Sequence, residues 1–174
     1  RISKIGKRHE FTSRKIITLE NQYLLPAFID MHTHLFLEAR HPSIGFAQDL
    51  IAISQLKEET RIAKAKERAR EYARAGFLTL RDLGQAGNHL EHHVTFPRII
   101  YSGNGVAQFP GQFPLKALKS DVSKEHILYN NPSELKTQIQ SLKNHGATWL
   151  KVYLDNDPSP GELNRDQLSH ILQL

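Results

Sequence analysis

The stretch Leu24–Leu35 reads LLPAFIDMHTHL, and it places two histidines at alternate positions directly after a short apolar run. Side chains two residues apart on a β-strand lie on the same face, so the imidazoles of His32 and His34 can bind one metal ion. The alternative is that one or both rings pack in the interior or form ordinary hydrogen bonds. A bare His-x-His pair does not decide between these interpretations, so the surrounding sequence must.

The composition is that of a globular protein that can bury a core, with 39% hydrophobic and 24% charged residues among 174. The net charge of +5 includes the basic residues of 61–71, which are mixed with acids as on the solvated face of an amphipathic helix. We therefore expect no nucleic-acid partner. No apolar run approaches the length of a membrane span, so we expect no membrane partner.

The chain contains no cysteine, which excludes disulfide bonds and thiolate metal ligands. Histidine, carboxylates and modified lysine remain as candidate ligands. The sequence does not fix the cellular compartment, and the cytoplasm is the expectation.

Strand and helix patterns alternate after the histidine pair. The spacing of apolar residues over 49–74 predicts a crossover helix that ends at Gly76. Further strands are expected at 77–83, 98–102 and 148–154, with helices at 133–145 and from Leu163 onward. This order predicts a parallel sheet with helices packed outside it. Because the first residue is Arg1 and the last helix reads as cut off, the chain is expected to be a fragment.

Three segments, in this order, resemble the amidohydrolase superfamily. The Leu24–Leu35 stretch is similar to its first-strand pattern G-F-I-D-x-H-x-H, with Ala27 in place of the usual glycine. Residues 75–84, AGFLTLRDLG, resemble its second-strand segment A-G-[VF]-T-T-[VL]-R-D-[LA]-G. Residues 146–153, GATWLKVY, resemble its fourth-strand segment G-A-D-x-I-K-[VI]. The motif style is that of the prolidase-like and imidazolonepropionase-like branch.

The resemblance implies an α/β fold, a partial (β/α)8 TIM barrel of about the first four βα units, over residues 23–174. Residues 1–22 would then be the remnant of a small β-sandwich domain, with strands at 1–6 and 15–20. The resembled family draws further histidine ligands from its fifth and sixth strands and an essential aspartate from its eighth. None of those segments is in this chain, so we expect it to be inactive alone and assign no catalytic residue within it.

Lys151 is the second candidate ligand. Period two places Trp149, Lys151 and Tyr153 on one face of the strand, so Lys151 points into the barrel if the opposite face packs against helices. Burial and nearby cations lower the pKa of such an amine and favour its neutral form, which reacts with carbon dioxide to give a carbamate. The resemblance implies a carbamate at this position that bridges two metal ions. The alternatives are a lysine that extends to solvent or an unmodified amine that holds a carboxylate.

Two carboxylates are expected to support the ligands rather than bind metal. Asp30 shares the strand face of His32 and His34 but lies deeper, which favours a role in orienting an imidazole or the backbone. Asp82 ends the second strand and either has such a role or pairs with Arg81. The run Asn88–His93 is a weaker metal candidate through His89 and His93, and a solvated linker explains its composition equally well.

The resemblance implies a metal-dependent amidohydrolase that cleaves the C–N bond of an amide or cyclic amide in a small-molecule or dipeptide-like substrate. Its cofactors would be one or two divalent metal ions, zinc first among them, with a metal-activated hydroxide as nucleophile. The competing hypothesis is a catalytically incomplete fragment or a non-catalytic barrel scaffold. Its exposed sheet edges would then require the remainder of the barrel or a homo-oligomer partner.

Overall fold

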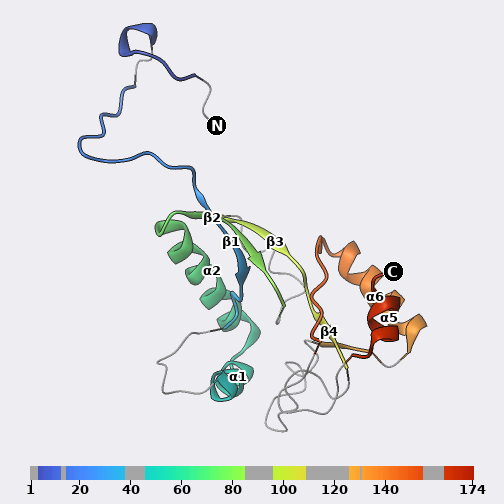
Figure 1. Cartoon of the computed structure of the whole chain (residues 1–174). Helices are drawn as coiled ribbons and strands as arrows, with labels where there is room; N and C mark the ends of the chain where they lie inside the picture. Colours follow the sequence, from blue (N-terminus) through green and yellow to red (C-terminus); the bar gives the residue numbers. More distant parts are fainter. Residues whose placement is uncertain are drawn as a thin grey trace.

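The computed structural model describes residues 4–12, 15–37, 46–84, 96–108, 126–129, 131–154 and 163–174. Its centre is a parallel sheet in the order β1-β2-β3, formed by β1 (Phe28–Thr33), β2 (Phe77–Asp82) and β3 (Arg98–Tyr101). Helix α2 (Glu58–Arg74) lies along this sheet, as Figure 1 shows. The expected α/β class with parallel strands is confirmed, whereas the partial barrel stays a prediction.

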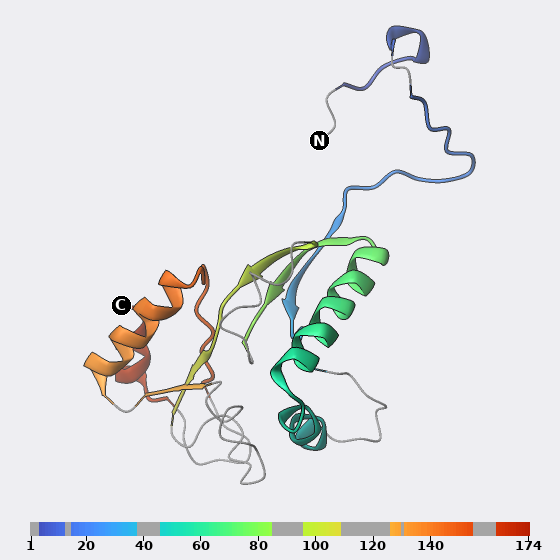
Figure 2. The ribbon, with the colours of Figure 1, turned by 180° about the vertical axis from the view of Figure 1, so that it is seen from behind.

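A second group of elements follows β3. Strand β4 (Gly105–Ala107) pairs in parallel with β5 (His126–Leu128). Helices α5 (Pro132–Asn144) and α6 (Arg165–Ile171) pack beside them, at the opposite end of the row of strands from α2, as Figures 1 and 2 show. The two groups are continuous, because only the turn at residues 102–104 separates β3 from β4.

The predicted strand over 148–154 runs beside β3 and β4, although only Val152 is assigned to a bridge, in parallel with Val106. Backbone hydrogen bonds nevertheless join this segment to β3 and β4. The N–H of Thr148 donates to Tyr101 at 3.0 Å, and Val106 donates to the carbonyl of Lys151 and accepts from Tyr153, both at 2.8 Å. The segment is thus the next parallel neighbour in the sheet.

Two apolar clusters hold these layers together. Around α2, the buried side chains are Leu35, Phe36, Ala65, Ala69, Leu80 and Tyr101. Around α5 and α6, they are Val106, Ile127, Leu135, Leu142, Leu163 and Ile171, with Leu150 and Val152 packed against them. The small Ala65 and Ala69, four residues apart on one helix face, let α2 approach the sheet closely.

The predicted helix over 49–74 is in fact two helices, α1 (Phe46–Ser54) and α2, so this expectation was wrong in detail. The break falls at residues 55–57, and after Leu56 the next large aliphatic residue comes six positions later at Ile62, which interrupts the helical period. Lys57 has the extended backbone of a residue preceding a helix. The predicted ends at Gly76 and Gly146 are confirmed, and both glycines have φ of +94°.

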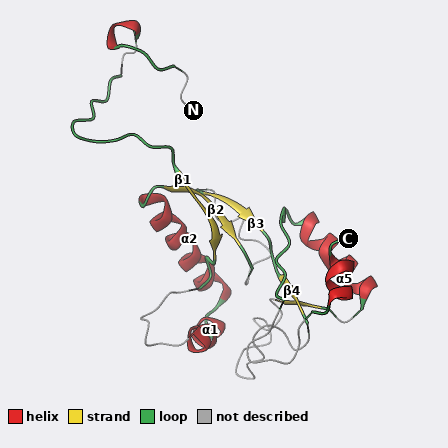
Figure 3. Ribbon diagram, in the orientation of Figure 1, coloured by secondary structure: helices red, strands yellow, loops and turns green. Residues whose placement is uncertain are grey.

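Residues 4–12 and 15–27 run away from the sheet and are drawn mostly as loop in Figure 3. They contain one short turn of 3-10 helix, η1 (Arg8–Glu10). The expected strands at 1–6 and 15–20 are not formed within the described residues. A strand needs a neighbour for its backbone hydrogen bonds, and here Ile16 and Ile17 are exposed. The assignment of residues 1–22 to a sandwich remnant therefore stays a prediction.

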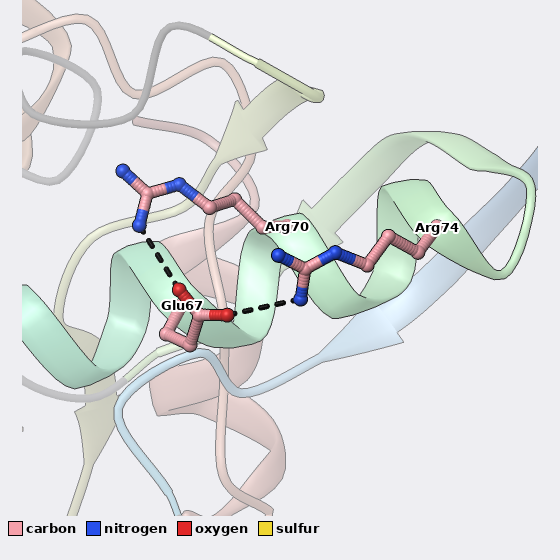
Figure 4. A network of polar contacts seen from close by, with 3 residues as sticks. All are labelled: Glu67, Arg70 and Arg74. Carbon is pink, nitrogen blue, oxygen red and sulfur yellow. Dashed lines mark hydrogen bonds and ion pairs between the residues drawn. The ribbon is translucent and has the colours of Figure 1, made fainter.

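The outer face of α2 carries the mixed charges predicted for residues 61–71. Glu67 forms ion pairs with Arg70 and Arg74, both at 3.0 Å, as Figure 4 shows. These hydrogen bonds to the two arginines lower the pKa of the exposed Glu67 carboxyl. Among the helices in the described part of the chain, none is long and apolar enough to cross a membrane.

Candidate metal centre

His32 and His34 point their rings toward each other at the carboxyl end of β1. Their Nε2 atoms lie 3.2 Å apart. Two nitrogens bound to one zinc ion at 2.0–2.1 Å in tetrahedral geometry would lie about 3.3 Å apart. The separation of the two nitrogens therefore fits a pair of ligands on one divalent ion, and equally fits a hydrogen bond in the metal-free protein.

At the carboxyl end of β1, the face opposite the histidine pair is buried. Thr33 and Leu35 are 2% and 0% exposed, and Leu35 packs in the cluster around α2. The Thr33 hydroxyl also donates to the carbonyl of Arg81 at 3.1 Å, which ties β1 to β2 at this level. Alternation then turns His32 and His34 to the face that α2 does not cover.

His34 is held by the turn after β2. Its Nδ1 lies 3.5 Å from the carbonyl oxygen of Gly84, at the long end of hydrogen-bonding distance. Burial lowers the pKa of the His34 imidazole, and the nearby His32 and Lys151 lower it further. The ring is thus neutral at physiological pH, which is the state that binds a metal.

Lys151 lies on the same open face as the histidines. Leu150 and Val152 pack against the cluster around α5 and α6, so the intervening Lys151 turns the other way. Its charge acts on His34, which places the amine within electrostatic range of the ring. Burial lowers the pKa of the Lys151 amine, and the charge of Arg81 adds to this. Both effects increase the fraction of neutral amine that can form a carbamate.

The two carboxylates predicted to support the site both contact the backbone of the histidine segment. Asp30 accepts a hydrogen bond from the N–H of His32 at 3.0 Å, at a shift in the register between β1 and β2. Asp82 accepts from the N–H of Leu35 at 2.9 Å and is 1% exposed. Burial raises the pKa of the Asp82 carboxyl to about 7. The ion pairs between described residues do not include the alternative pair of Asp82 with Arg81.

Within the described ranges, no group of three or more His, Cys, Asp or Glu side chains could hold a metal ion. Among the described residues, the donors on this face are the two imidazoles and Lys151, whose unmodified amine is not a carboxylate-like ligand. His89, His93 and the rest of the Asn88–His93 run lie outside the described residues. Whether any of these groups binds metal stays a prediction.

Sequence reasoning did not place three side chains, those of Arg81, Tyr153 and His126, at the site. Arg81 places its guanidinium 4.5 Å from the ring centroid of Trp149 and donates to the carbonyl of Met31 at 2.6 Å. Tyr153 packs beside Lys151, and the ring of His126 meets that of Tyr153 edge to face at 5.2 Å. Period two had already put Tyr153 on the face of Lys151. His126 carried no such signal, because β5 comes from a distant part of the chain.

Among the comparisons with known proteins, only the one with solved structures bears on the fold. No family model and no curated protein matches the sequence. Solved structures do match. An amidohydrolase superposes with a TM-score of 0.65 at 21% identity, over 92% of this chain and 45% of its own. A prolidase complexed with N-methylphosphonate-L-proline gives 0.65 at 19% identity, over 91% of this chain and 44% of its own.

The chain has the fold of solved amidohydrolases and prolidases. An A. niger ochratoxinase also matches, with a TM-score of 0.65 at 16% identity, over 85% of this chain and 40% of its own. The chain thus spans less than half the length of the solved structures it matches. At these identities the likeness establishes the fold, and the chemistry must be argued from the site.

Proposed function

We propose that this chain belongs to the amidohydrolase superfamily and supplies part of the active site of a metal-dependent hydrolase. The observation that carries the proposal is the 3.2 Å separation of the His32 and His34 Nε2 atoms on the open face of a parallel sheet. The fold shared with solved amidohydrolases and prolidases supports it, as do the three motifs in family order. We propose that the barrel is partial, and that the remaining ligands come from strands this chain does not contain.

In this proposal, His32 and His34 would hold a divalent ion through their imidazoles, and Lys151, as its carbamate, would supply oxygen ligands to the metal centre. When bound, such ions polarise a carbonyl group and provide a hydroxide nucleophile at neutral pH. The chain's own residues orient the ligands. The carbonyl of Gly84 lies beside Nδ1 of His34 and favours one orientation of the ring. The carboxylate of Asp82 accepts a hydrogen bond from the backbone N–H of Leu35, next to His34.

The proposed substrates are dipeptide-like molecules or cyclic amides that are cleaved at a C–N bond. The prolidase-like motif style favours this class, and solved structures of the same fold include a prolidase and a Xaa-Pro dipeptidase. Zinc is the first choice of metal, because neutral imidazole and carboxylate-like oxygens are both good zinc ligands.

Metal titration of this chain tests the proposal. We expect one zinc or cobalt ion to bind per chain, and the cobalt spectrum to report nitrogen and oxygen ligands. His32→Ala and His34→Ala should each abolish stoichiometric binding. His9→Ala is the matched control, because His9 lies in the exposed turn η1, far along the chain from the site. Equal binding by the control and the His32 variant would contradict the proposal.

A second candidate is a non-catalytic scaffold that pairs with another polypeptide. The exposed fractions of Ile29 (59%), Met31 (43%) and Trp149 (49%) favour it, because about half of each apolar side chain stays accessible to a partner in the described structure. This candidate predicts a dimer or higher oligomer whose assembly is unaffected by His32→Ala, together with no tightly bound metal. Sedimentation measured alongside the metal content separates the two candidates.

A further inference from the structure

The amine of Lys151 lies over the face of a buried aromatic ring. Its Nζ is 4.9 Å from the ring centroid of Tyr153, and Tyr153 is 7% exposed. The His126 ring contacts the same tyrosine edge to face, with centroids 5.2 Å apart. The tyrosine therefore cannot move aside freely, and it offers the lysine a fixed surface.

Gly105 has no side chain, and this leaves room for the methylene chain of Lys151. A Cβ atom at Gly105 would lie 2.9 Å from Cγ of Lys151 and closer still to the ring of Tyr153. Real Cβ atoms do not approach other atoms so closely, and the buried Tyr153 has little room to yield. Gly105 is not among the glycines with positive φ, so an alanine there would act through steric contact alone.

A second glycine, Gly84, lies close to Tyr153 and Lys151 on the side of the histidines. A Cβ at Gly84 would meet the Tyr153 hydroxyl at 2.8 Å and Cγ of Lys151 at 3.7 Å. The carbonyl of Gly84 is the group that lies 3.5 Å from Nδ1 of His34. One short turn therefore lies next to both the lysine stem and the histidine ring, so that the packing of Lys151 at this turn affects where its amine lies relative to His34.

We propose that Tyr153 and Gly105 are positioning residues for Lys151: the tyrosine ring packs against the amine, and Gly105 leaves space for the lysine stem on the open face of the sheet that carries His34. The importance of this for catalysis rests on the proposed function, because a misplaced amine could not carry a bridging carbamate. The packing itself does not depend on a metal and can be measured without one.

The first test is the ring-current shift of the Lys151 amine. Reductive methylation with isotope-labelled formaldehyde adds an observable methyl signal to each lysine, and Lys151→Arg identifies the one of interest. We expect this signal upfield of the other lysines in the unaltered chain. It should return to the position of an exposed lysine in Tyr153→Leu and move in Gly105→Ala, and it should stay upfield in Tyr153→Phe, which keeps the ring.

Tyr129→Leu is the matched control. Tyr129 also pairs edge to face with a histidine, His170, at 6.0 Å, and it packs against the cluster around α5 and α6 rather than beside Lys151. The Tyr129→Leu variant should therefore leave the methyl signal of Lys151 unchanged. A Lys151 signal at the exposed position in the unaltered chain, or one insensitive to Tyr153→Leu, would overturn the proposal. Tyr153→Leu decides the matter if circular dichroism shows that Gly105→Ala does not fold.

The second test asks whether the position matters for carbamate formation. Labelled bicarbonate and zinc should give a carbamate carbon signal in the unaltered chain and in Tyr153→Phe, and none in Tyr153→Leu or Gly105→Ala. Retention of the carbamate in Gly105→Ala would overturn the positioning role while the proposed function stands. A ring-current shift without any carbamate, in contrast, would support the packing and count against the proposed function.

Discussion

Nε2 of His32 faces Nε2 of His34 at 3.2 Å while Nδ1 of His34 faces the carbonyl oxygen of Gly84. A carbonyl oxygen only accepts hydrogen bonds, so the proton of the neutral His34 ring is on Nδ1 and its Nε2 is an acceptor. His32 must then donate from Nε2 in the metal-free protein. One of the two proposed ligands is thus already in the tautomer that binds metal through Nε2, and the other is not.

Zinc binding is therefore expected to move the ring proton of His32 from Nε2 to Nδ1 and to leave His34 in its present tautomer. Nitrogen chemical shifts of the labelled imidazoles report the tautomer directly. His145, whose Nδ1 lies 2.7 Å from the carbonyl of Ser141, serves as an internal control that should not change. A His32 ring that keeps its Nε2 proton at saturating zinc would exclude it as an Nε2 ligand.

Gly84→Ala should destabilise the chain more than Gly76→Ala. Both positions have positive φ, +92° and +94°, and alanine in this region costs about 1–2 kcal/mol. At Gly76 the new methyl group meets only the ring of Phe28 at 3.5 Å, an ordinary contact. At Gly84 it meets the Tyr153 hydroxyl at 2.8 Å, which should add about 1–3 kcal/mol.

Urea denaturation of the two glycine variants measures this difference. The backbone term is common to both, so the excess in Gly84→Ala isolates the contact with Tyr153. Combining Gly84→Ala with Tyr153→Phe, which removes the hydroxyl that the methyl group meets, should recover part of that excess. Equal losses in the two single variants would show that Tyr153 moves aside without cost.

Much of this fold could be predicted from the sequence because the signals are local. The glycine ends of two helices, the alternation at Thr33 and Leu35, and the β-branched or apolar runs of β2 and β3 depend only on neighbouring residues. The break between α1 and α2 was also present in the sequence, in the wide gap between Leu56 and Ile62. The expected strands in residues 4–6 and 15–20 failed because a strand depends on a partner, which local sequence does not specify.

The candidate site divides in the same way. The shared face of His32 and His34 follows from spacing alone, and the inward direction of Lys151 follows from the apolar residues on either side of it. The closeness of Gly84 and Gly105 to the Lys151 stem could not be predicted, because it brings together three segments that are distant in the sequence. Asp82 was expected near the barrel mouth, but its complete burial beneath Leu35 is a property of the tertiary packing.

Leu80→Ala should be the most damaging truncation on β2. Leu80 is 0% exposed and packs with Ala65 and Ala69 of α2, so its removal leaves a cavity that those small side chains cannot fill. We expect a loss of about 2–5 kcal/mol in the free energy of unfolding. Leu78→Ala is the control two residues earlier on the strand. Leu78 is 38% exposed, and its truncation should cost less than about 1 kcal/mol.

The stability of the metal-free chain should fall as pH rises, through Asp82. Its pKa is about 7 in the folded state and near 3.9 when unfolded, so the folded chain binds more protons between these values. The contribution of Asp82 to stability is thus complete below about pH 4 and lost as pH rises through about 7, by an amount on the order of a few kcal/mol. The charged carboxylate is disfavoured because Asp82 is 1% exposed and the N–H of Leu35 is its recorded hydrogen-bond donor.

Asp82→Asn tests this directly, because the amide oxygen can still accept from Leu35 while the charge is removed. The variant should be more stable than the unaltered chain at about pH 8 and lose that advantage at about pH 5. Comparing the two proteins at each pH cancels other titrating groups. The most important is His126, whose burial lowers its pKa to about 4 and makes stability fall toward acid pH, in the opposite direction. A constant difference between the two proteins across this range would mean that Asp82 is ionised in the folded chain.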